Sequence, residues 1–359
     1  MYIAVEDIKP GYQLKEDVMA QTSNPIIPAG TILTDQHIRF LRAFSIQSVD
    51  IMIEEENPLA SFPSASTSIK VSPMINTMEQ LYFTALERVK EEFQRWQSGM
   101  NVEIARVRAI ILPVLEYTLE NPKQIQKISA YSKKDTYLYH HALSVGLLSG
   151  MLAQKLNYDK GVIVQSALAG LLADCGMSKI KMSLLMKGTA LTESEYKEIQ
   201  NHPVVSYKMV KDLNLLKPEA KLAIYQHHER LDGSGYPMAA KANTIHGISQ
   251  LVGLADTYHA LTTDRLFRRR QSVFKAVEMI QQDLFGQFDL SIIDALLSLI
   301  ADLYPGMDVF LSNGSKGKVM FVHPGHKTRP LVQLSNGDII DLVKRRDLYI
   351  EKSEEKTAN

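Results

Sequence analysis

The sequence predicts a mainly α protein in which a helical bundle is flanked by a small N-terminal α+β module and a small C-terminal β-module. Over most of residues 76–303, apolar residues recur three and four positions apart, as on the buried face of a helix. Residues 1–55 mix alternating and helical patterns, and residues 304–352 alternate around two Asn-Gly pairs.

The N-terminal module, residues 1–55, begins with the alternating stretch IAVEDI and turns at Pro10-Gly11. It continues through IIPAGTIL to a helix-like segment, TDQHIRFLRAF. Residues 56–75 then carry prolines and serines without periodicity, which predicts a linker. We therefore expect a domain boundary here.

Residues 76–124 predict a helical connector, in which Pro113 is expected to kink the second helix or to end its first half. Pairing of these helices between subunits would give a homodimer. Residues 125–303 form the predicted helical domain, and residues 304–352 a small β-barrel-like module. A charged tail, residues 353–359, is expected to fray.

Composition excludes several classes of partner. The 40 Lys and Arg residues balance the 40 Asp and Glu residues, so no global charge favours nucleic acid or an anionic membrane. The single cysteine, Cys175, fits a reducing compartment. The N-terminus lacks an export signal, and the most apolar run, residues 142–153, is too short to span a bilayer. We predict a cytoplasmic protein.

Histidine and aspartate residues recur in the helical domain where metal ligands are expected. Asp174 and Asp256 each end an apolar run, and a buried carboxylate requires a cation, hydrogen bonds or protonation. Histidines occur in DTYLYHHALSV, IQNHPVVSY and HHERLDGSGYP. A lone histidine is more often an ordinary core or surface residue, and the HHERLDGSGYP stretch also fits a helix that ends at a glycine.

Histidine and carboxylate together suit zinc, iron or manganese, whereas the absence of a cysteine cluster argues against a structural zinc site. Two such ions bridged by a carboxylate could activate water and hold phosphoryl oxygens. The hypothesis that follows from these residue types is phosphoester hydrolysis.

Residues 135 to about 290 resemble the HD-GYP domain, a branch of the HD phosphohydrolase superfamily associated with cyclic di-GMP hydrolysis. HHERLDGSGYP reproduces the naming motif, and DTYLYHHALSV, LTESEYKEIQNHP, LADTYHAL and TDRLFR follow the order and spacing of the family. The resemblance implies an HD-type helical bundle with Asp174 and His202 at the catalytic centre. It implies these metal ligands: His141, Asp174, His202, His227, His228 and Asp256. It also implies a GYP loop at Gly235, Tyr236 and Pro237 and phosphate contacts from Arg265 and Arg268, although Arg268-Arg269-Arg270 also fits a solvated basic face.

The sequence departs from the family pattern at positions that belong to the expected catalytic centre. Ala173 replaces the histidine of the His-Asp pair, and Met177 replaces a lysine three residues after the aspartate. Lys179 is expected to point elsewhere, and Cys175 to be a buried small residue instead of a substitute ligand. Three further family positions also differ, and they are occupied by Tyr137, Ser206 and His259.

These observations support three hypotheses. The first is a metal-dependent phosphodiesterase of reduced activity that hydrolyses cyclic di-GMP to pGpG or GMP. It would use one or two divalent ions, iron or manganese first, with zinc, magnesium and nickel as alternatives. The second is an inactive module that binds cyclic di-GMP or a signalling partner such as a diguanylate cyclase. The third is hydrolysis of a different nucleotide, because a fold alone does not choose a substrate.

Overall fold

The structure is a computed structural model, and it describes residues 2–354 with gaps. The residues outside the description are 1, 6, 10, 20–26, 35–36, 39–40, 42–45, 53–76, 133, 186, 188, 265–268 and 355–359. The chain divides into two compact units, Met1–Ser72 and Pro73–Asn359. Each unit is described by itself.

The first unit contains a small antiparallel sheet with strand order β1-β3-β2. Its strands are β1 (Tyr2–Ala4), β2 (Gln13–Leu14) and β3 (Ser48–Met52). Leu14, Leu33 and Leu41 are buried in its core. Most of the predicted helix TDQHIRFLRAF and the whole of the predicted linker 56–75 lie outside the described residues.

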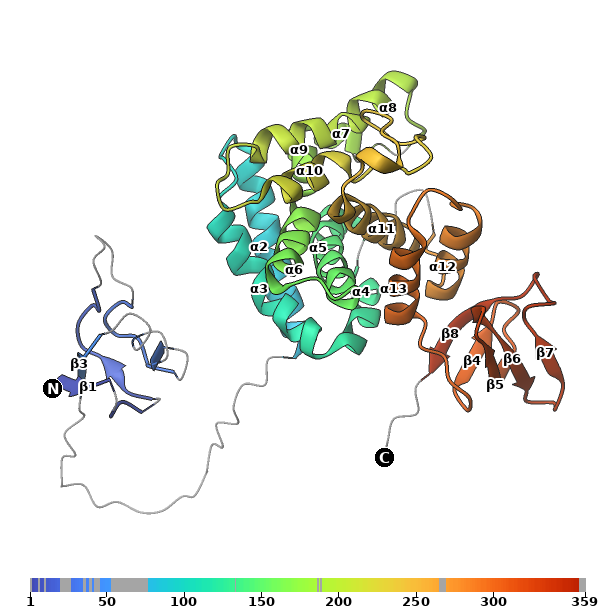
Figure 1. The fold of residues 1–359 in the computed structure, drawn as a ribbon, viewed down its shortest axis with the longest axis horizontal. Helices are drawn as coiled ribbons and strands as arrows, with labels where there is room; N and C mark the ends of the chain where they lie inside the picture. Colours follow the sequence, from blue (N-terminus) through green and yellow to red (C-terminus); the bar gives the residue numbers. More distant parts are fainter. Residues whose placement is uncertain are drawn as a thin grey trace, which may run out of the picture. The chain divides into compact units, whose positions relative to one another are not determined.

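The second unit begins with a helical bundle (Figure 1), which agrees with the predicted mainly α class. Its α-helices are α2 (Met78–Gln97), α3 (Ile104–Glu120), α4 (Ile128–Tyr131), α5 (Tyr137–Lys155), α6 (Lys160–Leu172), α7 (Met182–Leu185), α8 (Glu193–Gln200), α9 (His202–Val210), α10 (Pro218–Gln226), α11 (Gly247–Thr262), α12 (Val273–Gln282) and α13 (Leu290–Ile300). Short 3-10 turns are η1 (Pro122–Lys127), η2 (Lys134–Thr136), η3 (Cys175–Lys179) and η4 (Ala242–Thr244).

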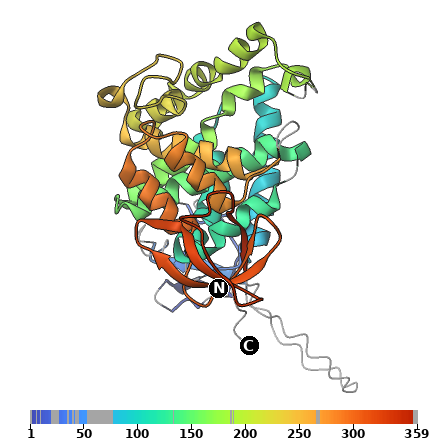
Figure 2. The same ribbon diagram turned by 90° about the vertical axis from the view of Figure 1, so that its right-hand side faces the viewer.

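Helices α5 and α6 form the centre of the bundle, and α2, α3, α10 and α11 pack around them (Figures 1 and 2). Residues 140–153 of α5 are all buried, as expected for a helix covered on every side. The two central helices approach so closely that a Cβ on Gly170 would lie 2.7 Å from the carbonyl oxygen of Val145. This tight pair fixes the end of α6, beyond which Asp174 is the residue before η3.

Helix α3 continues through Pro113, so the expectation that this proline ends the first half of the helix is wrong. A proline inside a helix removes a hydrogen bond and costs about 3 kcal/mol. Buried residues on both sides of it, including Ile111 and Leu115, hold the two halves against the bundle. The apolar faces of α2 and α3 are thus covered within the same chain.

The segment Lys160–Lys179 is long and apolar enough to cross a bilayer by composition. Since 72% of the tested window is buried inside the unit, it packs here as a core helix. No other described helix of 18 residues or more meets the same criterion.

A five-stranded antiparallel sheet with order β7-β6-β5-β4-β8 completes the second unit. Its strands are β4 (Asp308–Leu311), β5 (Lys316–His323), β6 (His326–Leu334), β7 (Ile339–Asp341) and β8 (Ile350–Glu354). The Asn-Gly pairs lie in the β4–β5 and β6–β7 turns, where Gly314 and Gly337 adopt φ of +83° and +93°. Both hairpins therefore occur where the sequence predicts them.

This β-module is joined to the helical bundle through α12. Arg329 of β6 places Nη2 2.6 Å from Oε2 of Glu278 on α12, and both side chains are buried. Nη1 of the same arginine donates to the carbonyl oxygens of Leu342 and Leu348. Ser272, which caps α12, donates to the carbonyl oxygen of Ile350.

We expect Arg329→Met to lower the free energy of unfolding by about 3 kcal/mol, because the buried Glu278 carboxylate would keep only the partly exposed Lys275 ammonium, 3.9 Å away, as a partner. Urea denaturation followed by circular dichroism measures this loss. The control is Arg345→Met, since the Arg345–Asp347 pair is exposed and contributes little. Equal effects of the two substitutions would contradict a stabilising role for the buried pair.

Candidate active site

Five segments of the second unit bring the predicted ligands to one place. His141 lies in the first turns of α5, Asp174 precedes η3 and His202 begins α9. His227 and His228 follow the last residue of α10, and Asp256 lies in the middle of α11. Helix packing therefore assembles residues that are up to 115 positions apart in the sequence.

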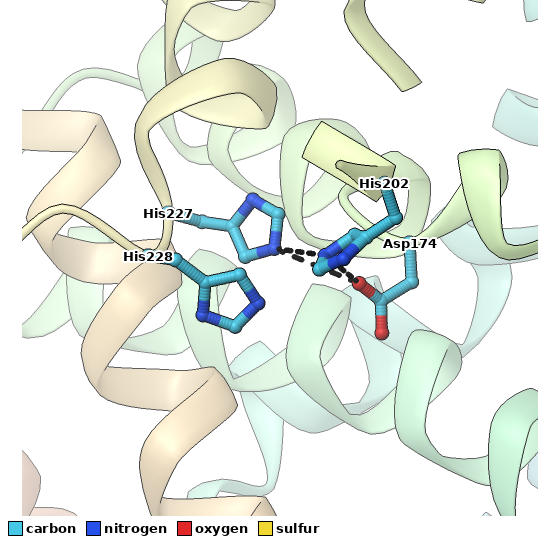
Figure 3. A group of neighbouring side chains, drawn as sticks. All are labelled: Asp174, His202, His227 and His228. Atoms are coloured by element: carbon cyan, nitrogen blue, oxygen red, sulfur yellow. Dashed lines mark hydrogen bonds and ion pairs between the residues drawn. The ribbon is translucent and has the colours of Figure 1, made fainter. Parts of the chain in front are cut away.

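Asp174, His202, His227 and His228 form the tightest group (Figure 3). Each offers one ligand atom, and these atoms all lie within 4.8 Å of one another. Nε2 of His202 lies 3.1 Å from Nε2 of His227 and 3.1 Å from Oδ1 of Asp174. Nε2 of His227 lies 3.6 Å from the same oxygen.

The hydrogen bonds behind these rings show which nitrogen atoms carry lone pairs. Nδ1 of His202 donates to the carbonyl oxygen of Ile199, and Nδ1 of His227 donates to that of Ile224, both at 2.8 Å. A neutral imidazole with a proton on Nδ1 has only a lone pair on Nε2. Two such lone pairs thus face each other and Asp174 Oδ1, which is buried and accepts no hydrogen bond of good geometry from the described residues.

Acceptors at this distance repel one another unless positive charge, either a metal ion or a proton on one imidazole, lies between them. The carbonyl bonds to Nδ1 are also the usual way in which a protein orients metal-ligating histidines. Histidine nitrogen and carboxylate oxygen are ligands that zinc, iron and manganese accept. The four residues therefore fit a divalent metal ion.

Electrostatics keep the group ready to bind a cation. Burial alone would raise the pKa of Asp174, but the neighbouring imidazoles, first His202, hold that pKa well below its ordinary value. Burial, together with the neighbouring His227, lowers the pKa of His228 well below its ordinary value, so this ring stays neutral and keeps a lone pair.

The remaining predicted ligands lie on the other side of Asp174. Nε2 of His141 is 2.8 Å from Oδ1 of Asp256 and 3.6 Å from Oδ2 of Asp174. On the opposite edge of the ring, Nδ1 of His141 is 2.9 Å from Nδ1 of His259 and 3.1 Å from the Tyr137 hydroxyl. His141 and Asp256 are therefore already paired with each other.

Ala173 immediately precedes Asp174 and is buried without a donor atom. Cys175 does not replace the missing ligand, because its thiol is buried and contacts the carbonyl oxygen of Ser206. The hydroxyl of Ser206 accepts the N–H of Gly176 at 2.8 Å and so fixes the turn after Asp174. The site thus contains one four-residue group that fits an ion and a second half with fewer free ligands.

The loop after the paired histidines folds back beside them. A Cβ on Gly235 would lie 2.4 Å from the carbonyl oxygen of His228, so only glycine fits there. Glu229 is buried, and its carboxylate accepts the N–H groups of Met238 and Ala240 at 2.7 and 2.8 Å. This clamp stacks the Tyr236 ring on His228 with centroids 4.6 Å apart.

A cavity of about 560 Å³ opens over the group. Met177 lines it, whereas the ammonium of Lys179 donates to the carbonyl oxygen of Trp96 and, as expected, points elsewhere. Arg265 and Arg268 lie outside the described residues. The described cavity lining includes Tyr137, His141, Asp174, Met177, Tyr196, His202, His228, Arg230, Tyr236, Asp256, Thr257, Met279, Asp283, Leu284 and Gln287.

The sequence motifs did not single out several of these lining residues. Arg230 lies inside HHERLDGSGYP and Tyr196 inside LTESEYKEIQNHP, so their places in these motifs are the sequence signal for them. Asp283 and Gln287 lie outside every motif, and only the tertiary fold brings them to the cavity.

Comparison with known proteins agrees with this geometry. Residues 125–292 match a family described as HD domain. The chain is 26% identical over 243 residues to a cyclic di-GMP phosphodiesterase of Pseudomonas aeruginosa, covering 67% of this chain and 58% of that protein. It is 27% identical over 222 residues to a 3'3'-cGAMP-specific phosphodiesterase of Vibrio cholerae, covering 59% and 48%. The chain spans about half the length of these two relatives.

A solved structure shares the fold. An HDG"Y"P protein from Bdellovibrio bacteriovorus aligns with a TM-score of 0.50 and 17% identity. The alignment covers 83% of this chain and 98% of that one.

Proposed function

We propose that residues 125–292, which match a family described as HD domain, form a metal-dependent phosphodiesterase that hydrolyses cyclic di-GMP to pGpG or GMP. One observation carries the proposal: Nε2 of His202 and Nε2 of His227 converge on Oδ1 of Asp174, at 3.1 and 3.6 Å, beside a cavity. The substrate class is supported by relatives named cyclic di-GMP phosphodiesterases.

Asp174, His202, His227 and His228 would hold the ion, with His141 and Asp256 as further ligands on the far side of Asp174. A bound divalent ion supplies Lewis-acid chemistry, which polarises phosphoryl oxygens and makes water more acidic. The chain itself orients the imidazoles through the Ile199 and Ile224 carbonyls. Tyr236 borders the space above His228, where it limits the access of water and positions the substrate.

Imidazole and carboxylate ligands favour iron or manganese, and zinc, magnesium and nickel remain alternatives. The phosphate contacts proposed for Arg265 and Arg268 rest on the sequence motif alone. We also propose that the protein works in the cytoplasm, because its one cysteine is a free buried thiol. Homodimer formation stays a prediction.

A second candidate function rests on Ala173 and Met177. Neither residue supplies a ligand or a charge where the family pattern has a histidine and a lysine, and losing one electrostatic group can cost about a hundredfold or more in rate. The domain would then bind cyclic di-GMP, or a partner such as a diguanylate cyclase, without hydrolysing it. If the domain is a phosphodiesterase, these two positions still predict reduced activity.

We expect purified protein loaded with manganese or iron(II) to convert cyclic di-GMP to pGpG or GMP, and a chelator to abolish this turnover. Chromatographic separation of the products measures the rate, and elemental analysis gives the metal content. Metal-loaded protein that binds cyclic di-GMP in calorimetry but forms no product would favour the binding module. Absence of both binding and turnover would overturn the two proposals together.

A further inference from the structure

A second wall of the cavity has no role in the proposed chemistry. It comes from α12 and the turn that follows this helix, and it contributes Met279, Asp283, Leu284 and Gln287. The turn is joined to the loop of the paired histidines by a hydrogen bond of 3.1 Å from the N–H of Leu231 to the carbonyl oxygen of Gln287. Both walls therefore border the same cavity.

Asp283 is unexpected in a cavity that accepts an anion. Its carboxylate makes no hydrogen bond or ion pair with any described residue, and its side chain is exposed. A negative charge here repels phosphate, so it opposes binding of any cyclic dinucleotide unless it accepts hydrogen bonds from the ligand.

Guanine carries the donors that suit this acceptor. Its N1–H and N2–H₂ groups lie side by side on one edge, and an ionised carboxylate accepts hydrogen bonds with both of its oxygens. Adenine presents an acceptor at N1 beside the N6 amino group, so it offers a carboxylate no such pair of donors. Reading an unstacked base on this edge is the common way in which proteins recognise single nucleotides.

Arg230 supplies the complementary donor. Its Nη1 donates to the carbonyl oxygens of His227 and Glu229 at 3.0 and 2.8 Å, and Nη2 donates to the Thr257 hydroxyl at 3.2 Å. The guanidinium also lies 4.8 Å from the ring centroid of Phe288. These contacts hold the group rigidly at the cavity and leave its Nε–H without an acceptor among the described residues.

We propose that this wall reads one guanine of the substrate, with Asp283 accepting N1–H and N2–H₂ and Arg230 donating to O6 or N7. Arginine to the O6 and N7 atoms is the commonest specific contact to guanine. The inference rests on the proposed function, since it names the base that the same cavity selects. It predicts tighter binding of cyclic di-GMP than of cyclic di-AMP, with 3'3'-cGAMP accepted through its single guanine.

The test is Asp283→Asn, measured by calorimetry on manganese-loaded protein with cyclic di-GMP and cyclic di-AMP. We expect affinity for cyclic di-GMP to fall roughly 5- to 150-fold, the range for losing a good base contact. Affinity for cyclic di-AMP should hold or rise, because an amide can pair with adenine. Asp283→Ala should lose the guanine preference without gaining adenine binding.

The matched control is Asp212→Asn, an exposed aspartate that does not line the cavity. If Asp283→Asn tightens binding of both dinucleotides equally, the residue contributes only negative charge and the inference is wrong. Unchanged affinity for both would also overturn it. If wild-type protein binds neither nucleotide, the proposed function itself fails, whereas equal binding of both by the wild type overturns only the base reading.

Discussion

Asp174→Ala is expected to abolish both metal binding and the hydrolysis of cyclic di-GMP. Asp174 supplies the carboxylate of the four-residue group and lies between the two halves of the site. Its Oδ1 is 3.1 Å from Nε2 of His202, and its Oδ2 is 3.6 Å from Nε2 of His141. Without it, only imidazoles remain on one side and the His141–Asp256 pair on the other. A catalytic ion contributes several kcal/mol to the transition state, so the rate should fall by about 1,000-fold or more.

Elemental analysis and product chromatography on the same preparations measure the two losses together. Asp174→Asn keeps the size of the side chain but removes the charge, and it should lose metal nearly as completely. Asp212→Ala serves as the exposed control. Metal content near the wild-type level in either Asp174 variant, with helical circular dichroism intact, would show that the ion is held elsewhere.

Ala173→His should have the second large effect, in the opposite direction. The alanine immediately precedes Asp174 and is buried, at the position where the family pattern has a histidine. A third protein ligand there completes the usual minimum for a catalytic ion, so metal content should rise from about one to about two ions per chain. We expect turnover to increase by about a hundredfold.

Ala173→Leu is the control for this substitution, because it adds comparable bulk to the buried position without a ligand atom. If Ala173→His gains neither metal nor turnover while its fold is preserved, the missing histidine is not what limits the site. Turnover by the variant alone would assign the wild-type chain to the binding module.

Much of the helical domain could be predicted because its signals are local. The three- and four-residue spacing of apolar residues marks α2 and α3, and the Asn-Gly pairs mark two hairpins of the β-module. The continuation of α3 through Pro113, instead of an end to its first half, has a tertiary cause. Burial on both sides of the proline outweighs the local tendency of proline to break a helix. The spacing of residues within one helix does not show how tightly that helix packs against others.

The candidate site was predictable only as far as motifs extend. His227 and His228 could be identified from the sequence, whereas the pairing of His141 with His259 joins residues 118 positions apart. The wall at Asp283 belongs to no motif, since an exposed aspartate after a helix resembles any solvated residue. Its place at the cavity depends on how α12 packs.

Helix α12 connects two parts of the molecule that the chain order separates. Its Glu278 anchors the β-module, and the next residue, Met279, already lines the cavity. The β-module therefore supports, through α12, one wall of the cavity. Loss of the terminal sheet would therefore be expected to loosen α12 and, with it, the cavity wall at Met279 and Asp283.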